Sequence, residues 1–286
     1  MNALLTAHEL ERDAALAPPS SNPPPSVPLV EPLAMLVRRG FSPSLATLDL
    51  PFATSLSAAA QGALAEALDR YAFRLFLRGA IQRGDGFSPE EATRFLTAER
   101  AAELAQTLIA LGLAEPIEGG RLRLCKQACS FGGTLEWYVA RQLRERYALE
   151  TVAGVKFHAP GIGGDLDVIA AAEGKLIVLE LKSSPPKHLG EEEVAAFFDR
   201  LAALRPDVTI FAMDTALRLS DKVIPILTAE LDRRRSSRRR RAPRRIEREL
   251  WALSPHLYVA NAKPNLISNI GRALADGLRA LSPPFP

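Results

Sequence analysis

The sequence has few of the residues, and none of the segments, that mark secreted or membrane proteins. It contains only two cysteines, Cys125 and Cys129, which are too few for a disulfide framework. No uninterrupted apolar run approaches the roughly 20 residues that a membrane-spanning helix needs. The first residues, MNALLTAHELERD, lack the basic stretch and apolar core of a secretory signal. These absences lead us to expect a cytoplasmic protein with reduced thiols and no membrane contact.

Thiolate and imidazole ligands for a metal are equally scarce. Cys125 and Cys129 are spaced to share one face of a helix, which could supply half of a zinc site. No second cysteine pair completes that site, and the four histidines are scattered along the chain. We therefore interpret the cysteines as two ordinary thiols.

Positive charge is concentrated in one segment. The 286 residues carry a net charge of +3, with 47% hydrophobic and 24% charged residues, which is typical of a globular chain of one large or two ordinary domains. Residues 233–248 contain ten arginines and one glutamate, whereas the rest of the chain has 26 basic and 32 acidic residues. One segment thus makes the whole protein basic.

This arginine-rich segment has three interpretations. It could contact nucleic acid through Arg238, Arg239, Arg240 and Arg241, because guanidinium groups suit phosphates. It could also be a disordered inserted loop or the solvated end of a helix. No aromatic residue lies inside it, so base stacking has no support there. We expect a disordered or loosely helical insertion that attracts phosphate.

The N-terminal half predicts an arm followed by a small helical unit. Residues 1–55 are rich in Pro, Ala and Ser, so we expect an extended arm or linker, most clearly at 17–28. Residues 56–130 predict three helices and then a hairpin that turns at Gly119-Gly120. This order resembles a winged helix-turn-helix.

The third of these helices does not look like one that reads DNA. Over residues 98–111 its only basic residue is Arg100, which lies between Glu99 and Glu103. A helix that enters a DNA groove should present positive charge to the phosphates. We therefore favour a structural or protein-contact unit over a DNA-reading one.

Residues 131–286 alternate helical and strand patterns, which predicts an α/β fold with helices on both faces of one mixed sheet. A hairpin is expected in the segment GDLDVIAAAEGKLIVLELK, residues 164–182, with its turn at Glu173-Gly174. In that register Asp167 lies opposite Glu180, and Asp165 lies opposite Lys182.

Such an arrangement needs a cation. Directly opposed side chains have Cβ atoms roughly 5 Å apart, where like charges repel each other. Asp167 and Glu180 therefore call for Lys182 or a divalent ion with oxygen ligands between them. The alternative is a frayed hairpin end with solvated charges. Asp165 could pair with Lys182 or assist the other acids.

The predicted order of helix, three strands, helix and strand resembles the core of the PD-(D/E)XK nuclease superfamily. The acid that this superfamily carries on its second strand matches Asp167, and its E-x-K motif matches Glu180-Leu181-Lys182. Its additional acid on the first helix matches Glu136. The resemblance covers about half of the chain and is nearest to restriction-type and CRISPR-associated effector nucleases, in which a winged helix can precede the core. A sensing Rossmann-type domain, common in such effectors, is not expected from the Pro-rich N-terminus.

The resemblance implies a site for Mg²⁺, or Mn²⁺ in its place. Asp167 and Glu180, with the carbonyl of Leu181, would hold the ion, and Lys182 would position a water or stabilise charge on the phosphate. Glu136 would hold a water or a second ion. Nucleases of this superfamily often act as homodimers, which is therefore one assembly that the resemblance allows.

Two of the residues around this motif have alternatives. Glu136 shares an apolar helix face with Val139 and Leu143 and is expected in the first turn of its helix. Its carboxylate could therefore simply be one that the helix dipole stabilises. Lys187 follows the motif and could flank the site or belong to a plain loop.

Two function hypotheses follow. The first is a metal-dependent nuclease that hydrolyses the phosphodiesters of DNA or RNA. The second is a non-catalytic nucleic-acid-binding or regulatory protein that keeps the same fold as a scaffold. The intact set Asp167, Glu180, Lys182 and Glu136 favours the first. A winged-helix transcription factor is a third possibility, which the acidic third helix disfavours.

Overall fold

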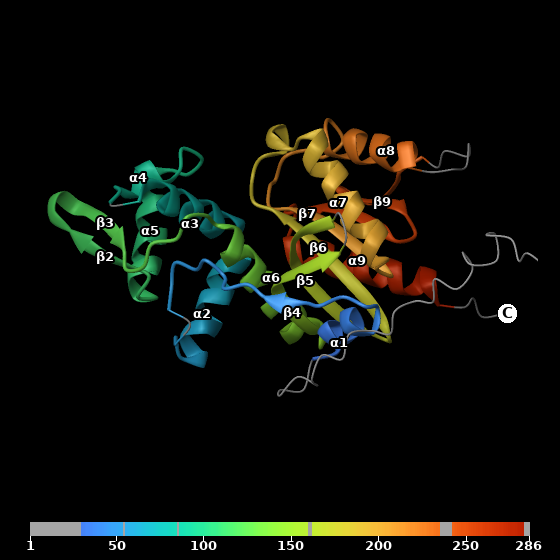
Figure 1. The fold of residues 1–286 in the computed structure, drawn as a ribbon. Helices are drawn as coiled ribbons and strands as arrows, with labels where there is room; N and C mark the ends of the chain where they lie inside the picture. Colours follow the sequence, from blue (N-terminus) through green and yellow to red (C-terminus); the bar gives the residue numbers. More distant parts are fainter. Residues whose placement is uncertain (1–29, 54, 85, 160–161, 235–241, 283–286) are drawn as a thin grey trace, which may run out of the picture.

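The computed structural model describes residues 30–53, 55–84, 86–159, 162–234 and 242–282. They form two lobes (Figure 1). We call residues 58–124 the helical lobe, and residues 31–45 together with 132–281 the sheet lobe. No helix in these described ranges is long and apolar enough to cross a membrane.

One mixed sheet organises the sheet lobe, as the sequence predicts, and among the described residues it has eight strands. In spatial order its strands are β1 (Ser44–Leu45), β4 (Glu150–Ala159), β5 (Ile162–Ala172), β6 (Lys175–Lys182), β7 (Val208–Met213), β10 (Leu257–Asn261), β9 (Leu250–Ser254) and β8 (Arg244–Glu247). Of these strands, β1, β8 and β9 were not predicted. Strand β7 runs parallel to β6 and β10, and all other neighbours are antiparallel.

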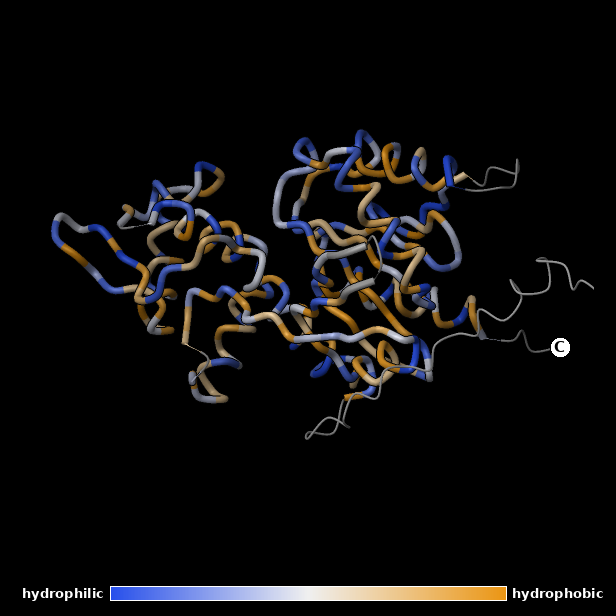
Figure 2. The backbone as a smooth tube through the Cα atoms, in the orientation of Figure 1, coloured by the Kyte–Doolittle hydropathy of each residue, from blue (hydrophilic) through white to orange (hydrophobic). Residues whose placement is uncertain are grey.

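Helices cover both faces of this sheet. Helices α6 (Gly132–Tyr147) and α9 (Leu266–Leu281) pack on one face, while α1 (Glu31–Arg38), α7 (Glu191–Leu204) and α8 (Val223–Arg234) pack on the other. Along β6, Ile177 and Leu179 pack into the core on the α6 face of the sheet, and Leu176 and Val178 pack into the core on the α1 face. A strand buried on both faces has no polar side to solvate, which explains its continuous apolar run (Figure 2).

Among the described residues, the helical lobe contains four helices, where the sequence predicts three, and then the predicted two-stranded hairpin. They are α2 (Ala58–Asp69), α3 (Tyr71–Arg83), the short α4 (Pro89–Ala92), α5 (Ala98–Ala110), β2 (Ala114–Ile117) and β3 (Arg121–Leu124). A 3₁₀ turn, η1 (Glu118–Gly120), joins the two strands where the turn was expected.

The helical pattern over residues 56–84 is interrupted at Arg70, which has an extended backbone with ψ of 120°. The guanidinium of Arg74 explains the break, since its Nη1 donates to the carbonyl oxygens of Leu68 at 2.5 Å and Asp69 at 3.2 Å. Because Arg74 already donates to these two carbonyl oxygens, they do not need the backbone N–H donors that a continuing helix would provide.

Residues 30–53 are not the arm or linker that composition predicted. Helix α1 buries Leu33 and Leu36 against the sheet, and β1 pairs with β4. Proline-rich flanks concealed an amphipathic segment here, because proline at the first turn of a helix does not oppose helix formation. Residues 1–29 lie outside the described residues.

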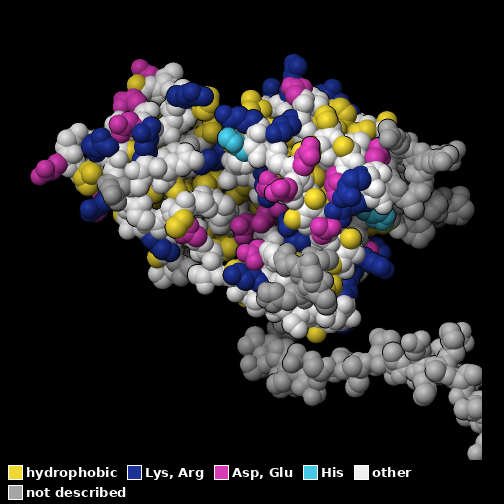
Figure 3. Space-filling view, turned by 45° about the horizontal axis from the view of Figure 1, so that its top comes forward, with side chains coloured by type: hydrophobic (Ala, Val, Ile, Leu, Met, Phe, Trp, Pro, Cys, Tyr) yellow, Lys and Arg dark blue, Asp and Glu magenta, His cyan; other side chains and the backbone are white. Residues whose placement is uncertain are grey.

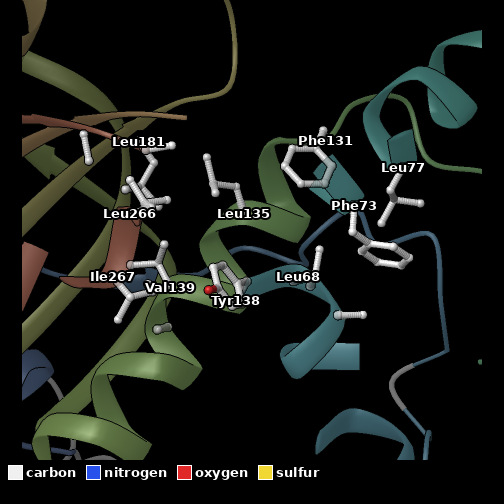
Figure 4. Packing of buried hydrophobic residues seen from close by; sticks show 14 of the residues in the cluster. Leu68, Phe73, Leu77, Phe131, Leu135, Tyr138, Val139, Leu181, Leu266 and Ile267 are labelled. Carbon is white, nitrogen blue, oxygen red and sulfur yellow. The ribbon is translucent and has the colours of Figure 1, made fainter. Parts of the chain in front are cut away.

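One hydrophobic core extends through both lobes, and the other buried clusters lie on the opposite face of the sheet. Helix α6 stands at the centre of this core, between α2 and α3 on one side and β6 and α9 on the other (Figure 4). The labelled members are Leu68, Phe73, Leu77, Phe131, Leu135, Tyr138, Val139, Leu181, Leu266 and Ile267. Burial is therefore continuous from the helical lobe into the sheet.

The arginine-rich insertion is not a single loop. Helix α8 extends through Arg234, so the segment begins as the end of a helix, which is one of the three interpretations. Residues 244–247 form the edge strand β8, so the expected disordered or loosely helical insertion is wrong there. Arg244 pairs with Asp276 at 2.5 Å, and Arg245 lies 5.6 Å from the ring centre of Trp251. Arg238, Arg239, Arg240 and Arg241 lie outside the described residues.

Candidate active site at the end of the β5–β6 hairpin

The hairpin of β5 and β6 has the predicted turn and register. Glu173 and Gly174 both have left-handed backbones, with φ of 53° and 68°. Two such residues in succession are characteristic of the primed turns that join two twisted strands. Pairing runs from Ala172 with Lys175 to Val168 with Leu179.

The pairing stops one step before the charged residues. Instead of a strand hydrogen bond, the carboxylate Oδ2 of Asp167 accepts from the amide N–H of Leu181 at 2.6 Å. Strand β6 continues its parallel pairing with β7 as far as Lys182. The two strands of the hairpin therefore separate where the acids begin, so Asp167 and Glu180 are not a regular opposed pair.

Glu180 is almost fully buried, with 3% of its surface exposed, and both of its carboxylate oxygens are engaged. Oε1 accepts from Lys182 Nζ at 2.8 Å, and Oε2 accepts from the guanidinium of Arg200 at 2.9 Å. Lys182 Nζ also lies 2.7 Å from Glu193 Oε1. Because Arg200 and Glu193 both belong to α7, that helix completes the surroundings of the E-x-K motif.

Glu136 faces this cluster from α6. The helix begins at Gly132, so Glu136 lies in the second turn and the expected stabilisation by the first-turn dipole does not apply. Burial, followed by the charges of Asp165 and Glu180, raises the pKa of Glu136 to about 7. Asp165 is itself exposed and lies opposite Lys156 in the register of β4 and β5, and no ion pair of the described residues joins it to Lys182.

The other titratable groups respond to the same crowding. Burial, and then the charge of Glu180, raises the pKa of Asp167 to about 8, although the Leu181 amide opposes the shift. Burial alone would lower the pKa of Lys182, but the carboxylates around it, chiefly Glu180, raise it overall.

Negative charge is therefore in excess at this place. The acids are Glu136, Asp165, Asp167, Glu180 and Glu193. Among the described residues, Lys182 and Arg200 form ion pairs with them, and Lys156 lies opposite Asp165 in the register of β4 and β5. Figure 3 shows acidic side chains gathered on this face of the molecule, near the junction of the lobes. A buried surplus of carboxylates is stabilised by an added cation.

The donor set fits a hard divalent cation in kind. Carboxylate oxygens are the preferred ligands of Mg²⁺, and Oδ1 of Asp167 accepts no hydrogen bond from a described residue. Glu180, by contrast, would have to release Lys182 or Arg200 to bind an ion. Consistent with this, no three His, Cys, Asp or Glu residues among those described already stand close enough together to hold a metal.

The structure does not connect Lys187 to the cluster. It lies exposed in the 3₁₀ turn η2 (Pro186–His188), and its carbonyl oxygen accepts from Lys222 Nζ at 2.7 Å. No hydrogen bond or ion pair of the described residues joins Lys187 to the acids.

Sequence reasoning missed two residues of α7 that contact the motif, Glu193 and the more deeply buried Arg200. The place of Arg200 on α7, three residues after Phe197 and four before Leu204, puts a charge on the buried face of an amphipathic helix. A charge at such a position needs a partner, and this was the available signal. The identity of that partner, Glu180, depends on how α7 packs on the sheet.

The chain was compared with known proteins by sequence and by fold. A scan against models of protein families finds no match, and a comparison with curated proteins finds none either. Among solved structures, protein VC1899 from Vibrio cholerae is 13% identical with a TM-score of 0.53, over 87% of this chain and 61% of that one. Can2 from Sulfobacillus thermosulfidooxidans, solved with cyclic tetra-adenylate, is 16% identical with a TM-score of 0.47, over 86% and 60%.

These likenesses differ in what they support. The chain spans about three fifths of the length of both proteins. The likeness to VC1899 shows a shared fold, and the likeness to Can2 is too distant to support more. The chain is thus a mixed α/β protein whose fold is shared with VC1899 from Vibrio cholerae.

Proposed function

We propose that this protein is a metal-dependent nuclease of the PD-(D/E)XK type. The observation that supports it is the cluster of Glu136, Asp167, Glu180 and Lys182 at the point where β5 and β6 separate. These four residues match the superfamily motif in sequence, and they come from three elements whose packing brings them together. The winged-helix resemblance of the helical lobe is part of the same proposal.

In this proposal Asp167 and Glu180, with the carbonyl of Leu181, hold Mg²⁺, and Mn²⁺ can replace it. A bound divalent ion would polarise the scissile phosphate and lower the pKa of a water. Glu136 holds a second ion or orients that water from the α6 side.

Lys182 acts as a cation and not as a base. Because its pKa is raised by the carboxylates around it, it stays protonated at neutral pH. Its ammonium group can therefore donate to a phosphate oxygen as negative charge grows there. Glu180 and Glu193 hold that group in position at 2.8 and 2.7 Å, so Glu180 would release Arg200 and keep Lys182 when it binds the ion.

One observation favours a second candidate, a non-catalytic scaffold that binds nucleic acid. The ion pairs of Glu180 with Lys182 and Arg200 already occupy both oxygens of the central carboxylate. In a scaffold these internal cations would permanently take the place of a metal.

The deciding experiment is cleavage of plasmid, linear duplex, single-stranded DNA and RNA, with Mg²⁺ or Mn²⁺ against EDTA. We expect metal-dependent cleavage that falls about a hundredfold or more in Asp167→Ala, because the ion loses a ligand. Asp221→Ala, which removes an exposed acid outside the cluster, should cleave like the wild type. Salt-sensitive binding without cleavage of any substrate would support the scaffold instead.

A further inference from the structure

A groove of about 670 Å³ is lined by residues of both lobes and extends to Pro185, three residues after the E-x-K motif. Helices α3 and α4 and the segment that follows α4 form one wall. The other wall consists of Pro185, which follows β6, and residues 215–217, which follow β7. Lys182 ends β6, and its carbonyl oxygen accepts from the amide of Asp214 at 2.8 Å. This wall of the groove therefore consists of residues that closely follow Lys182 and its backbone partner Asp214 in the chain.

The groove wall is positively charged. Arg78, Arg83 and Arg94 line it, and Glu91 is the only acid among its lining residues in the described chain. Glu91 is already neutralised, because its carboxylate lies 3.3 Å from the guanidinium of Arg121. An anion in the groove would therefore meet three guanidinium groups and little opposing charge.

A second surplus of positive charge lies beneath the groove. The buried carboxylate of Asp214 is shared by Arg74 at 2.9 Å and Arg78 at 2.7 Å, so two guanidinium groups share one negative charge. The Nε of Arg78 is buried and has no hydrogen-bond partner among the described residues. Because Arg78 also lines the groove, this unbalanced charge acts on whatever occupies it.

Apolar side chains stand exposed at the same groove. Phe95 is 68% exposed on the α4 side and Leu217 is 56% exposed on the β7 side. The guanidinium of Arg94 lies 5.2 Å from the ring centre of Phe95, which places a cation against an exposed aromatic ring. Such rings stack on nucleobases, with phosphates held by the arginines. Only unpaired bases offer their faces, because a duplex buries them in its own stack.

We propose that this groove binds a single strand of nucleic acid and leads its backbone to Lys182 and the carboxylate cluster. This inference rests on the proposed nuclease function and adds the substrate class to it. Phe95 stacks on a base, Arg83 and Arg94 contact phosphates, and Leu217 packs against the sugar or base on the opposite wall.

The test measures binding without cleavage. Fluorescence anisotropy would follow labelled single-stranded DNA and RNA of about 15 nucleotides, and a duplex of the same sequence, in EDTA. The groove variant is Arg94→Glu with Phe95→Ala. Its matched control is Arg144→Glu with Leu45→Ala, which changes the same charge and removes a similarly exposed side chain from residues that do not line the groove. Circular dichroism of both variants checks that they are folded.

We expect the wild type to bind the single strands more tightly than the duplex. The dissociation constant of the groove variant should rise about tenfold or more, as expected for one lost base stack and one reversed phosphate contact. That of the control variant should change less than about twofold.

Three results would overturn the proposal. The groove variant could bind single strands like the wild type, as it would if a polypeptide occupied the groove. Both variants could lose affinity equally, or the duplex could bind as well as the single strands. The failure of the nuclease function is distinct, because a catalytically inert protein would still show groove-dependent binding in EDTA.

Discussion

The candidate active site holds two kinds of carboxylate. Glu180 has a hydrogen-bond donor on each oxygen, whereas Glu136 and Asp167 remain under the repulsion of their neighbours. Repulsion between buried acids disfavours their ionised forms, which is why the pKa values of Glu136 and Asp167 are raised. Folding therefore stores an unfavourable interaction that protonation, or an added cation, relieves.

The first prediction at this scale is a loss of stability with rising pH. The raised pKa values mean that the folded state binds protons that the unfolded chain releases, so the free energy of unfolding falls as pH rises from about 4 to about 8. Urea unfolding across this range should show a decline on the order of 1–3 kcal/mol, after allowance for partial solvent screening. Glu136→Gln should flatten the decline, and Glu192→Gln, at an exposed position, should not. An identical slope in all three proteins would contradict the arrangement described.

The second prediction concerns Arg200. Arg200→Ala leaves Oε2 of the buried Glu180 without its donor, so we expect the free energy of unfolding in urea to fall by about 2–4 kcal/mol. Arg200→Lys should recover part of the loss, since an ammonium group keeps the charge but not the planar geometry. A change within about 0.5 kcal/mol for Arg200→Ala would show that Glu180 is adequately held by Lys182 alone.

Local chemistry at the residue scale was predictable, but the choice of distant partners was not. The turn at Glu173-Gly174 predicts the register of the hairpin, because residue type limits the turn geometry. The separation of the strands before Asp167 was not predictable, since it depends on the side chain of Asp167 taking the place of a strand hydrogen bond. The contact of Arg200 with Glu180 likewise depends on where α7 packs.

At the scale of elements, close helix contacts explain where glycine is required. Gly79 on α3 faces α4 so closely that an added Cβ would lie 1.5 Å from the carbonyl oxygen of Ala92. Gly62 on α2 has open space, with Arg141 at 4.0 Å as the only atom that such a Cβ would meet among the described residues. Close packing of α3 on α4 therefore requires glycine at Gly79, whereas no close contact requires it at Gly62.

The third prediction follows from this difference. Gly79→Ala should push α3 and α4 apart and lower the free energy of unfolding by about 2–4 kcal/mol. Gly62→Ala should raise it by about 0.5–1 kcal/mol, because alanine favours the helix and meets no clash. Thermal unfolding of both variants measures the two effects, and equal signs would contradict the packing of α4 on α3.

Whether an element can be predicted from the sequence depends on how regular the apolar periodicity of its residues is. The long strands and amphipathic helices of the sheet lobe were predictable, because their apolar periodicity is sustained. Strand β8 was not, since its four residues are mostly charged and its pairing with β9 lies at the sheet edge. Helix α1 was hidden by the prolines beside it.

At the scale of the whole molecule, two features couple the lobes. One is the core that continues through α6 from the helical lobe into the sheet (Figure 4). The other is the buried pairing of Asp214, at the end of β7, with Arg74 and Arg78 of α3. A lobe that shares its core with another cannot unfold alone without exposing the apolar surface of both.

The last prediction tests this coupling. All measurements use a Trp137→Phe background, so that Trp251 alone reports by fluorescence. With no further change, this protein should unfold in urea in one transition, with coincident midpoints for far-ultraviolet circular dichroism and for Trp251 fluorescence. Asp214→Ala leaves the buried guanidinium of Arg74 and the half-buried one of Arg78 without their shared carboxylate, so it should lower the free energy of unfolding by about 3–5 kcal/mol. Asp221→Ala, at an exposed position, should change it by less than about 0.5 kcal/mol. Because the core persists in Asp214→Ala, the two midpoints should fall together.

Two outcomes would contradict this expectation. Separate midpoints without the Asp214→Ala change would mean that the lobes fold independently. Separate midpoints only in Asp214→Ala would mean that the ion pairs, and not the apolar core, couple the lobes.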